Sequence, residues 1–244
     1  MHPRLAPFVS SIRSGVGHRS ESVRECLLPN GRTSLWLILN RDEFHCSRGT
    51  TSGAFIYGPD DHASAVEIEA GRVHVWVDFT PAGAGAFFPG LLPELRNAAV
   101  DLDAGWGRLR ERVLETRDVA PVEEILLERL AGPGDPAIAA AAGWLESGVS
   151  VGAVTEQLGL LPRTFRRRFV AAVGLTPKRY ARVRRLQRVV SAIDGREQPD
   201  WALVAAEHGY CDQSHLVDDF QDLIGATPGQ YLTRRVDGPN HLSL

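Results

Sequence analysis

Residues 163–193 read RTFRRRFVAAVGLTPKRYARVRRLQRVVSAI, and this stretch decides the fold of the second half of the chain. Its part FVAAVGLTPKRY, from Phe169 to Tyr180, has the same frame as FQDLIGATPGQY, from Phe220 to Tyr231. Both read Phe, four residues, Gly, one residue, Thr-Pro, two residues and Tyr, and they lie 51 residues apart. A helix that ends at a glycine, followed by a helix that begins at a proline, fits both copies. The sequence therefore predicts one structural unit that is used twice.

The residues before the first copy predict a helix-turn-helix. Ser150 can cap a helix over 151–158, and a turn at Gly159 follows. Pro162 then fits the first position of a second helix, in which Phe165 and Phe169 are spaced to share one buried face. We expect these phenylalanines to be core residues and not platforms for stacking on bases.

With that face buried, Arg163, Arg166 and Arg167 point outward near the beginning of the second helix. Recognition helices present side chains to base edges from this position in the major groove. Arginine suits the task because its planar guanidinium donates two hydrogen bonds to guanine O6 and N7.

The second copy repeats the plan. Asp200 can cap a helix that runs through Ala206, a glycine turn follows, and Asp212 can cap a helix that runs through Leu223. Leu216 and Phe220 form its buried pair. Between the two units, KRYARVRRLQRVVSAI predicts one long basic helix with a single apolar stripe of Val183, Leu186, Val189 or Val190, and Ile193.

Two such units joined by a long helix resemble the DNA-binding domain of the AraC/XylS family of bacterial transcription regulators. The residues that carry the resemblance are the stretch 163–193 and VAAEHGYCDQSHLVDDFQDLIGATPGQYL, and it covers about residues 137–233. It implies that the long helix sets both recognition helices into successive major grooves of a promoter. A weaker resemblance, through LPNGRTSLWLIL, IYGP and VDLDAGWG, links the first part of the chain to the sensor-type domain of such regulators.

The resemblance also implies which side chains contact DNA. In the first unit these are Arg163, Thr164, Arg166 and Arg167, and in the second Gln213, Ser214 and His215. His215 also has the position of a local helix cap, and Tyr180 and Tyr231 are expected to pack the two joints. The family commonly has a basic residue where this chain has Asp218, and an aspartate there would repel phosphate or at best accept a hydrogen bond from cytosine N4. We therefore expect the first unit to dominate the affinity.

Charge along the chain is strongly segregated although the net charge is only −3. Residues 1–150 carry a net −6, residues 151–193 carry +9, and residues 194–244 carry −6. Such an island of positive charge is typical of nucleic-acid contacts, and it includes Arg179, Arg182, Arg184, Arg185 and Arg188, which we expect to neutralise phosphates wherever they face the duplex. Lys178 is the only lysine, and the other 26 basic residues are arginines.

The first 80 residues predict strands and turns. A β-rich run covers 33–39, and RVHVWVDF alternates, with Val73, Val75 and Val77 on one face and His74, Trp76 and Asp78 on the other. Trp36, His74 and Trp76 are the candidate lining of a ligand pocket, although an outer or packing face of the sheet explains them as well. Amphipathic helices follow from about residue 105 and pack on the sheet.

The predicted fold class is α+β: a mostly antiparallel sheet or half-barrel with helices, then an all-helical domain of two helix-turn-helix units. The Pro- and Gly-rich AGPGDP stretch marks the linker. Expected boundaries are 1–132 for a sensor or dimerisation domain, 133–136 for the linker, 137–235 for the DNA-binding domain and 236–244 for a tail.

The sequence patterns predict no catalytic residues, cofactor or metal site. The histidines lack metal-binding spacing, and Cys26, Cys46 and Cys211 form neither a disulfide framework nor a zinc pattern. No membrane span or secretory signal pattern is present, so a cytoplasmic location is expected. The expected partners are double-stranded promoter DNA, RNA polymerase, a small-molecule effector and a second copy of the chain.

Two alternatives to a regulator remain open at this point. One is an enzyme whose active site lies in residues 1–135 and whose helical domain only localises it. The other is a protein-interaction module whose acidic second unit binds a basic partner.

Overall fold

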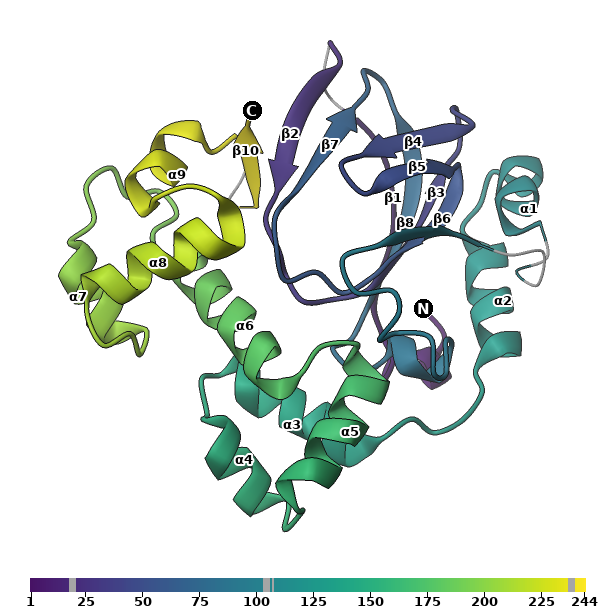
Figure 1. Cartoon of the computed structure of the whole chain (residues 1–244). Coiled ribbons are helices and arrows are strands. Elements are labelled where there is room, and N and C mark those ends of the chain that lie inside the picture. Colours follow the sequence, from purple (N-terminus) through teal and green to yellow (C-terminus); the bar gives the residue numbers. More distant parts are fainter. Residues whose placement is uncertain (18–20, 103–105, 107, 237–239) are drawn as a thin grey trace.

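A computed structural model describes residues 1–17, 21–102, 106, 108–236 and 240–244 of the chain. Antiparallel sheets come first in the sequence and a helical region follows, so the predicted α+β class is confirmed (Figure 1). The sensor-like fragment VDLDAGWG lies partly outside the described residues, at 103–105 and 107.

The described strands form two five-stranded sheets whose strand pairs are antiparallel. The first sheet has the order β1-β8-β3-β6-β9, with bounds Val9–Val16, Val73–Phe79, Ser34–Ile38, Ala54–Tyr57 and Ala99–Asp101. The second has the order β10-β2-β7-β4-β5, with bounds His241–Ser243, Val23–Leu27, Ser64–Ile68, Glu43–Cys46 and Gly49–Ser52.

The first sheet is covered on both faces. The alternation predicted for β8 is confirmed, because Val75 and Val77 are buried on one face while His74 and Trp76 lie on the other. The valine face packs against α1 (Leu109–Thr116), α2 (Ala120–Arg129) and the short 3-10 helix η2 (Ala84–Ala86), in one apolar cluster. The other face looks toward the second sheet.

The first helix-turn-helix unit forms as predicted from its local signals. It comprises α3 (Pro136–Glu146), α4 (Val151–Gln157) and α5 (Pro162–Val173). The Ser150 side chain caps α4 by accepting from the Ala153 N–H. Phe165 and Phe169 are core residues, as expected, and Tyr180 completes the cluster.

The second unit follows the long helix α6 (Pro177–Ala192) and comprises α7 (Trp201–Glu207), α8 (Gln213–Ile224) and α9 (Pro228–Arg234). Asp200 and Asp212 cap α7 and α8 through their side chains, as predicted. Leu216, Phe220 and Tyr231 are each fully buried in its core, which confirms their expected role.

The residues expected to form a tail have a defined place where the structure describes them. Residues 241–243 form β10, which pairs with β2 and extends the second sheet (Figure 1). The division of the chain into a sensor domain, linker and DNA-binding domain stays a prediction, with this strand as a physical link between the two parts.

Candidate nucleic-acid interface and ligand cavity

Helix α5, which the sequence predicts to be a recognition helix, packs on the core with one face and exposes the other. Leu161 is its N-cap and Pro162 is its first residue, where the missing N–H of proline leaves no hydrogen bond unmade. Phe165 and Phe169 pack edge-to-face, with ring centroids 5.6 Å apart, and both are at most 1% exposed. This aromatic pair fixes the rotation of the helix about its axis.

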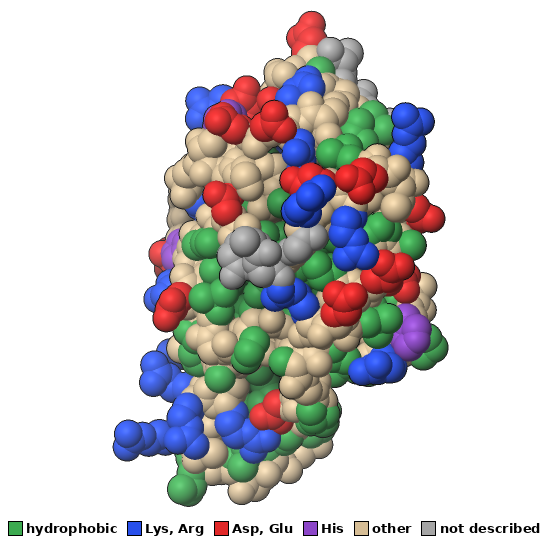
Figure 2. All heavy atoms as spheres, turned by 90° about the vertical axis from the view of Figure 1, so that its right-hand side faces the viewer, with side chains coloured by type: hydrophobic (Ala, Val, Ile, Leu, Met, Phe, Trp, Pro, Cys, Tyr) green, Lys and Arg blue, Asp and Glu red, His purple; other side chains and the backbone are tan. Residues whose placement is uncertain are grey.

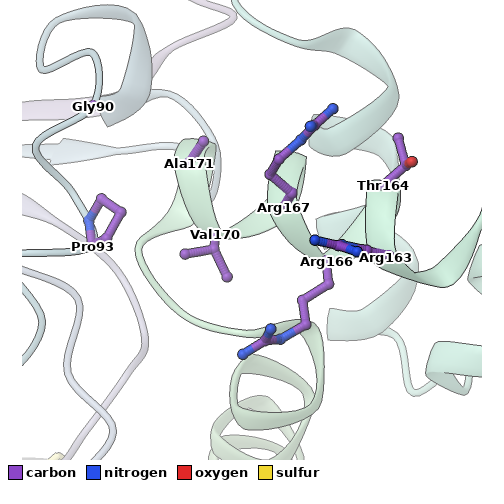
Figure 3. A pocket seen from close by; sticks show the side chains of 8 residues that line it. All are labelled: Gly90, Pro93, Arg163, Thr164, Arg166, Arg167, Val170 and Ala171. Carbon is purple, nitrogen blue, oxygen red and sulfur yellow. The ribbon is translucent and has the colours of Figure 1, made fainter.

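Arg163, Arg166 and Arg167 occupy the opposite face and are exposed. None of them forms a salt bridge with any residue that the structure describes. Figure 3 shows their guanidinium groups extending away from the axis of α5, with Thr164 beside them. Figure 2 shows Lys and Arg side chains gathered at the end of the molecule where Figure 1 places α4 and α5. Three unneutralised guanidinium groups on one helix face make a surface of strong positive potential.

A surface cavity of about 540 Å³ adjoins this face. Its wall on one side is α5, including Arg166, Arg167 and Val170, and on the other a loop that contains Gly90 and Pro93 (Figure 3). The recognition helix therefore lies next to the part of the chain that carries the sheets.

The fourth arginine of the run has a structural partner. Arg168 donates to both carboxylate oxygens of Asp135, at 2.8 and 2.7 Å. These bonds hold the pKa of Asp135 below its ordinary value. Asp135 also caps α3 by accepting from the Ile138 N–H, so the pair ties α5 to the start of α3.

The second unit presents a different surface. Gln213 and Ser214 are exposed in the first turn of α8. His215 is half-buried: its Nδ1 lies 3.5 Å from the Cys211 N, its Nε2 lies 3.3 Å from Arg185 Nη2, and its ring packs edge-to-face on Tyr210. Two of the three predicted contact residues, Gln213 and Ser214, are therefore exposed, whereas His215 contacts residues of its own unit and of α6.

The arginines of α6 have partners within the chain, and their expected role in neutralising phosphates stays a prediction. Arg182 and Arg185 bind Asp219 of α8 at 2.6 and 2.8 Å, and Arg182 also binds Asp222. Asp219 is buried, which makes these hydrogen bonds to a charged acceptor strong.

The remaining α6 arginines contact other elements. Arg184 lies 3.1 Å from Glu146, and Arg188 donates to the Glu146 carbonyl oxygen. Arg179 forms an ion pair with Asp61, which belongs to the sheet-containing part of the chain. Sequence reasoning could not find these partners, because each lies more than 30 residues away.

Trp36, His74 and Trp76 lie together and line a cavity of about 970 Å³ between the two sheets. Trp36 stacks on Trp76 with ring centroids 5.7 Å apart, and His74 lies 4.6 Å from Trp76. Phe55 and Phe44 continue the aromatic wall. The predicted candidates therefore face a hollow interior, in contrast to the alternative reading of an outer face.

Charged groups that sequence reasoning missed also line this cavity. Arg72 is 6% exposed, and its guanidinium lies 5.2 Å from the Phe44 ring centroid. It forms no salt bridge with a described carboxylate, and its Nε has no hydrogen-bond partner among the described residues. Burial in the first place, and the charge of Arg72 in the second, lower the pKa of His74, which favours the neutral imidazole. Asp60 and the Arg13–Asp78 pair add further charges to the wall.

Neither a metal centre nor a membrane segment emerges from the described residues. No group of three or more His, Cys, Asp or Glu side chains among them is arranged to hold a metal ion. Within the same residues, no helix is both long and apolar enough to cross a bilayer.

Residues 154–234 match the family model of a helix-turn-helix domain, which confirms the predicted resemblance over these residues. The sequence matches none of the curated proteins with which it was compared.

Solved structures with a similar arrangement include ToxT from Vibrio cholerae, at 10% identity over 92% of this chain and 98% of that chain, with a TM-score of 0.49. A ToxT structure described as bound to an unsaturated fatty acid has 9% identity over 91% and 95%, with a TM-score of 0.48. The C-terminal domain of AraT, a response regulator from Geobacillus stearothermophilus, has 21% identity over 42% of this chain and 89% of that chain, with a TM-score of 0.38.

Proposed function

We propose that this protein is a one-component, sequence-specific DNA-binding transcription regulator that reads a promoter site with two helix-turn-helix units, of which the first dominates the affinity. The observation that carries the proposal is the set of exposed guanidinium groups of Arg163, Arg166 and Arg167 on α5, which form no salt bridge with any described residue. They lie within a segment that matches a helix-turn-helix family. No catalysis forms part of the proposal.

The chemistry of the first unit supports base reading. An arginine that donates twice to guanine distinguishes it from the other bases by about 1–3 kcal/mol. Because Phe165 and Phe169 fix the helix rotation, these arginines are presented together and can act on one groove. Thr164, half-buried beside them, suits a contact to the DNA backbone at the rim of the groove.

The second unit suits a weaker, selective contact. Gln213 and Ser214 can donate to and accept from base edges, but neither carries charge. Asp218 is exposed on the same helix, and its carboxylate repels phosphate. We further propose that His215 orders the helix start by packing on Tyr210 and does not itself contact a base.

The part of the chain that carries the sheets is proposed to sense a small molecule. The aromatic wall of Trp36, His74 and Trp76 suits a flat, mostly apolar molecule. Arg72, buried and without a salt-bridge partner among the described residues, suits one anionic group on that molecule. Binding would shift the population between arrangements that differ in DNA affinity. The protein would act in the cytoplasm on transcription by RNA polymerase, as a dimer.

Selection of bound duplexes from a random pool tests the DNA reading. We expect a motif with two half-sites about one helical turn apart. On the selected duplex, Arg167→Ala should cost about 1–3 kcal/mol of binding free energy, and Ser214→Ala should cost less. Arg4→Ala is the control, because it removes an exposed arginine that lies far in sequence from both helix-turn-helix units. Binding that survives Arg167→Ala but is lost in Ser214→Ala would contradict the ranking.

Thermal unfolding in the presence of aromatic carboxylic acids, each compared with its neutral primary amide, tests the sensor site. A ligand that binds only the native state raises Tm. We expect at least one acid to raise Tm more than its amide, and Arg72→Gln to abolish that difference. If amides and acids stabilise the protein equally, the anionic assignment is wrong.

A further inference from the structure

Residues 240–244 contact the second sheet, the cavity between the sheets and the second helix-turn-helix unit, and they do so through one short strand. Strand β10 pairs with β2 in the register His241–Leu27, Leu242–Cys26 and Ser243–Glu25. The Leu28 N–H donates to the Asn240 carbonyl oxygen at 3.0 Å and continues this pairing. The strand thus lies at the edge of the second sheet, next to the helices of the second unit (Figure 1).

The alternation of a strand gives β10 two different faces. His241 points to the cavity that Trp36 and Trp76 also line, and its Nδ1 lies 2.8 Å from Glu25 Oε2. Leu242 points the other way, is 1% exposed and packs in the core of the second unit with Tyr231. One residue therefore forms part of the cavity wall, and the next forms part of the helix-turn-helix core.

The strand is also bonded to the end of α9. Arg234 donates through Nε and Nη2 to the Ser243 carbonyl oxygen, at 3.1 and 2.8 Å. The Val236 N–H donates to the His241 carbonyl oxygen at 3.0 Å. The strand is hydrogen-bonded on one side to β2 and on the other to the second unit. A movement of either element therefore strains the bonds to the other.

A second connection lies beside the first and involves α6. Gln187 Nε2 donates to the Pro29 carbonyl oxygen at 2.7 Å, and Arg184 Nη1 donates to that of Asn30 at 3.0 Å. In addition, Asp61 binds Arg179. In this docked arrangement the sheet-containing part covers cationic groups of the helix that joins the two reading units, so fewer charges are free for phosphate.

From these contacts we propose that residues 240–244 form an autoinhibitory strap. While the strap is docked on β2, it holds the second helix-turn-helix unit and the joining helix against the sheets, in an arrangement of low DNA affinity. Release of the strap frees the second unit to take its place on the duplex. The inference rests on the proposed function, since it concerns the DNA affinity of the same protein.

His241 gives the strap an inner face that a molecule in the cavity can reach. A ligand that displaces His241 from Glu25 removes one of the bonds that keep β10 on the sheet. The strap is thereby a route by which occupancy of the cavity reaches the second unit.

The first test compares two substitutions of the same kind two positions apart. Leu242→Asp places a charge in a buried site, whereas Leu244→Asp changes a side chain that is 60% exposed. On the duplex selected by the full chain, we expect Leu242→Asp to raise the affinity about tenfold and Leu244→Asp to leave it unchanged. Faster hydrogen exchange of the β2 amides in Leu242→Asp would report that the strap has been released. A variant that retains its helical circular dichroism and binds no better than the parent would overturn the proposal.

The second test locks the strap and does not depend on the folding of Leu242→Asp. Because Leu28 and Asn240 are a hydrogen-bonded pair, the adjacent pair Leu27–His241 is of the non-hydrogen-bonded kind, whose close Cα atoms accept a disulfide. In a background with Cys26, Cys46 and Cys211 changed to Ser, the double variant Leu27→Cys/His241→Cys should bind DNA about tenfold more weakly when oxidised than when reduced. The reduced form of the same protein is its own control.

The outcomes separate the two proposals. If the full chain selects no duplex, both the regulator and the strap are wrong. If it selects a duplex and the oxidised and reduced forms bind it equally well, only the strap is wrong.

Discussion

At the scale of single residues, Asp60 and Asp61 are neighbours whose carboxyl pKa values are shifted in opposite directions. Burial raises the pKa of Asp60 to about 6, although the charge of Arg48 opposes this. Burial would also raise the pKa of Asp61, but hydrogen bonds from Asn97 and Arg179 lower it to about 2. Asp61 therefore stabilises the fold as a carboxylate, whereas ionisation of Asp60 opposes folding.

The shift at Asp60 predicts a specific pH dependence of stability. Since the folded pKa lies above the unfolded value of 3.8, the stabilising contribution is present below about pH 4 and is lost as pH rises through 6. The free energy of unfolding of the parent relative to Asp60→Asn should therefore fall by about 2 kcal/mol between pH 4 and pH 7. Urea unfolding at several pH values measures this difference. Glu94→Gln, at an exposed carboxylate, is the control, and parallel curves for the parent and Asp60→Asn would refute the assignment.

The sequence predicts the environment of a side chain only when its partners lie a few residues away along the chain. Phe165 and Phe169, four residues apart, predict the buried face of α5, and the exposure of Arg166 follows from it. Arg185 looks equally available in the sequence, but its partner Asp219 lies 34 residues away. No local pattern predicts such a pair.

At the scale of elements, α6 joins the two units partly by ion pairs. Arg182 and Arg185 converge on Asp219, and the guanidinium of Arg185 also lies 4.0 Å from the Tyr210 ring centroid. Asp218, one residue earlier on α8, is exposed. Adjacent aspartates thus have separate tasks: one fixes α8 on α6, and the other faces outward.

Substitution of each aspartate by asparagine separates these tasks. Asp219→Asn leaves two arginines facing a neutral group and should cost about 3 kcal/mol of stability. Asp218→Asn should change stability by less than about 0.5 kcal/mol and should strengthen DNA binding, because a repelling charge is removed. Chemical unfolding and titration of the selected duplex measure the two quantities. If the two variants lose equal stability, the role given to Asp219 is incorrect.

Helices were predictable as elements because their signals are local. The caps Ser150, Asp200 and Asp212 and the residue Pro162 fix the beginnings of α4, α7, α8 and α5. Strand β10 was not predictable, because a three-residue strand has no periodicity and its partner β2 lies more than 200 residues earlier. It was expected to belong to a tail.

At the scale of the whole molecule, the two copies of the repeated joint differ in what surrounds them. Gly174 ends α5 and Gly225 ends α8, both with positive φ, of 82° and 78°. A Cβ at Gly174 would lie 2.7 Å from the Leu92 carbonyl oxygen and 2.6 Å from Pro59, whereas a Cβ at Gly225 would meet nothing within 4 Å. The sheet-containing part therefore packs closely against the glycine of the first joint, whereas the glycine of the second joint has open space beside it among the described residues.

This difference predicts unequal effects of one substitution. Gly225→Ala should cost about 1 kcal/mol, from the positive φ alone. Gly174→Ala carries the same backbone strain and in addition forces the chain away from Leu92, so we expect at least about 1 kcal/mol more. Chemical unfolding measures the costs, and faster hydrogen exchange around Leu92 should appear only in Gly174→Ala. If the two variants lose the same free energy of unfolding, the backbone at Leu92 moves away from the added methyl group without an energetic cost.

The cavity shows the limit of sequence reasoning at this scale. Alternation on β8 places His74 and Trp76 on one face, and that much was predicted. Whether that face meets solvent, helices or a hollow depends on the second sheet, whose strands pair with residues far along the chain. Arg72, at the edge of β8, gives no sign of its burial in the sequence.

The near absence of lysine has a consequence for how such a protein is switched off. Acetyltransferases neutralise amines and do not act on guanidinium groups, and Lys178 is the single amine-bearing side chain of the chain. Enzymatic acylation consequently has no means of erasing the charge on Arg163, Arg166 and Arg167. Under the proposed function, a change in DNA affinity that leaves these groups cationic has to move or cover them.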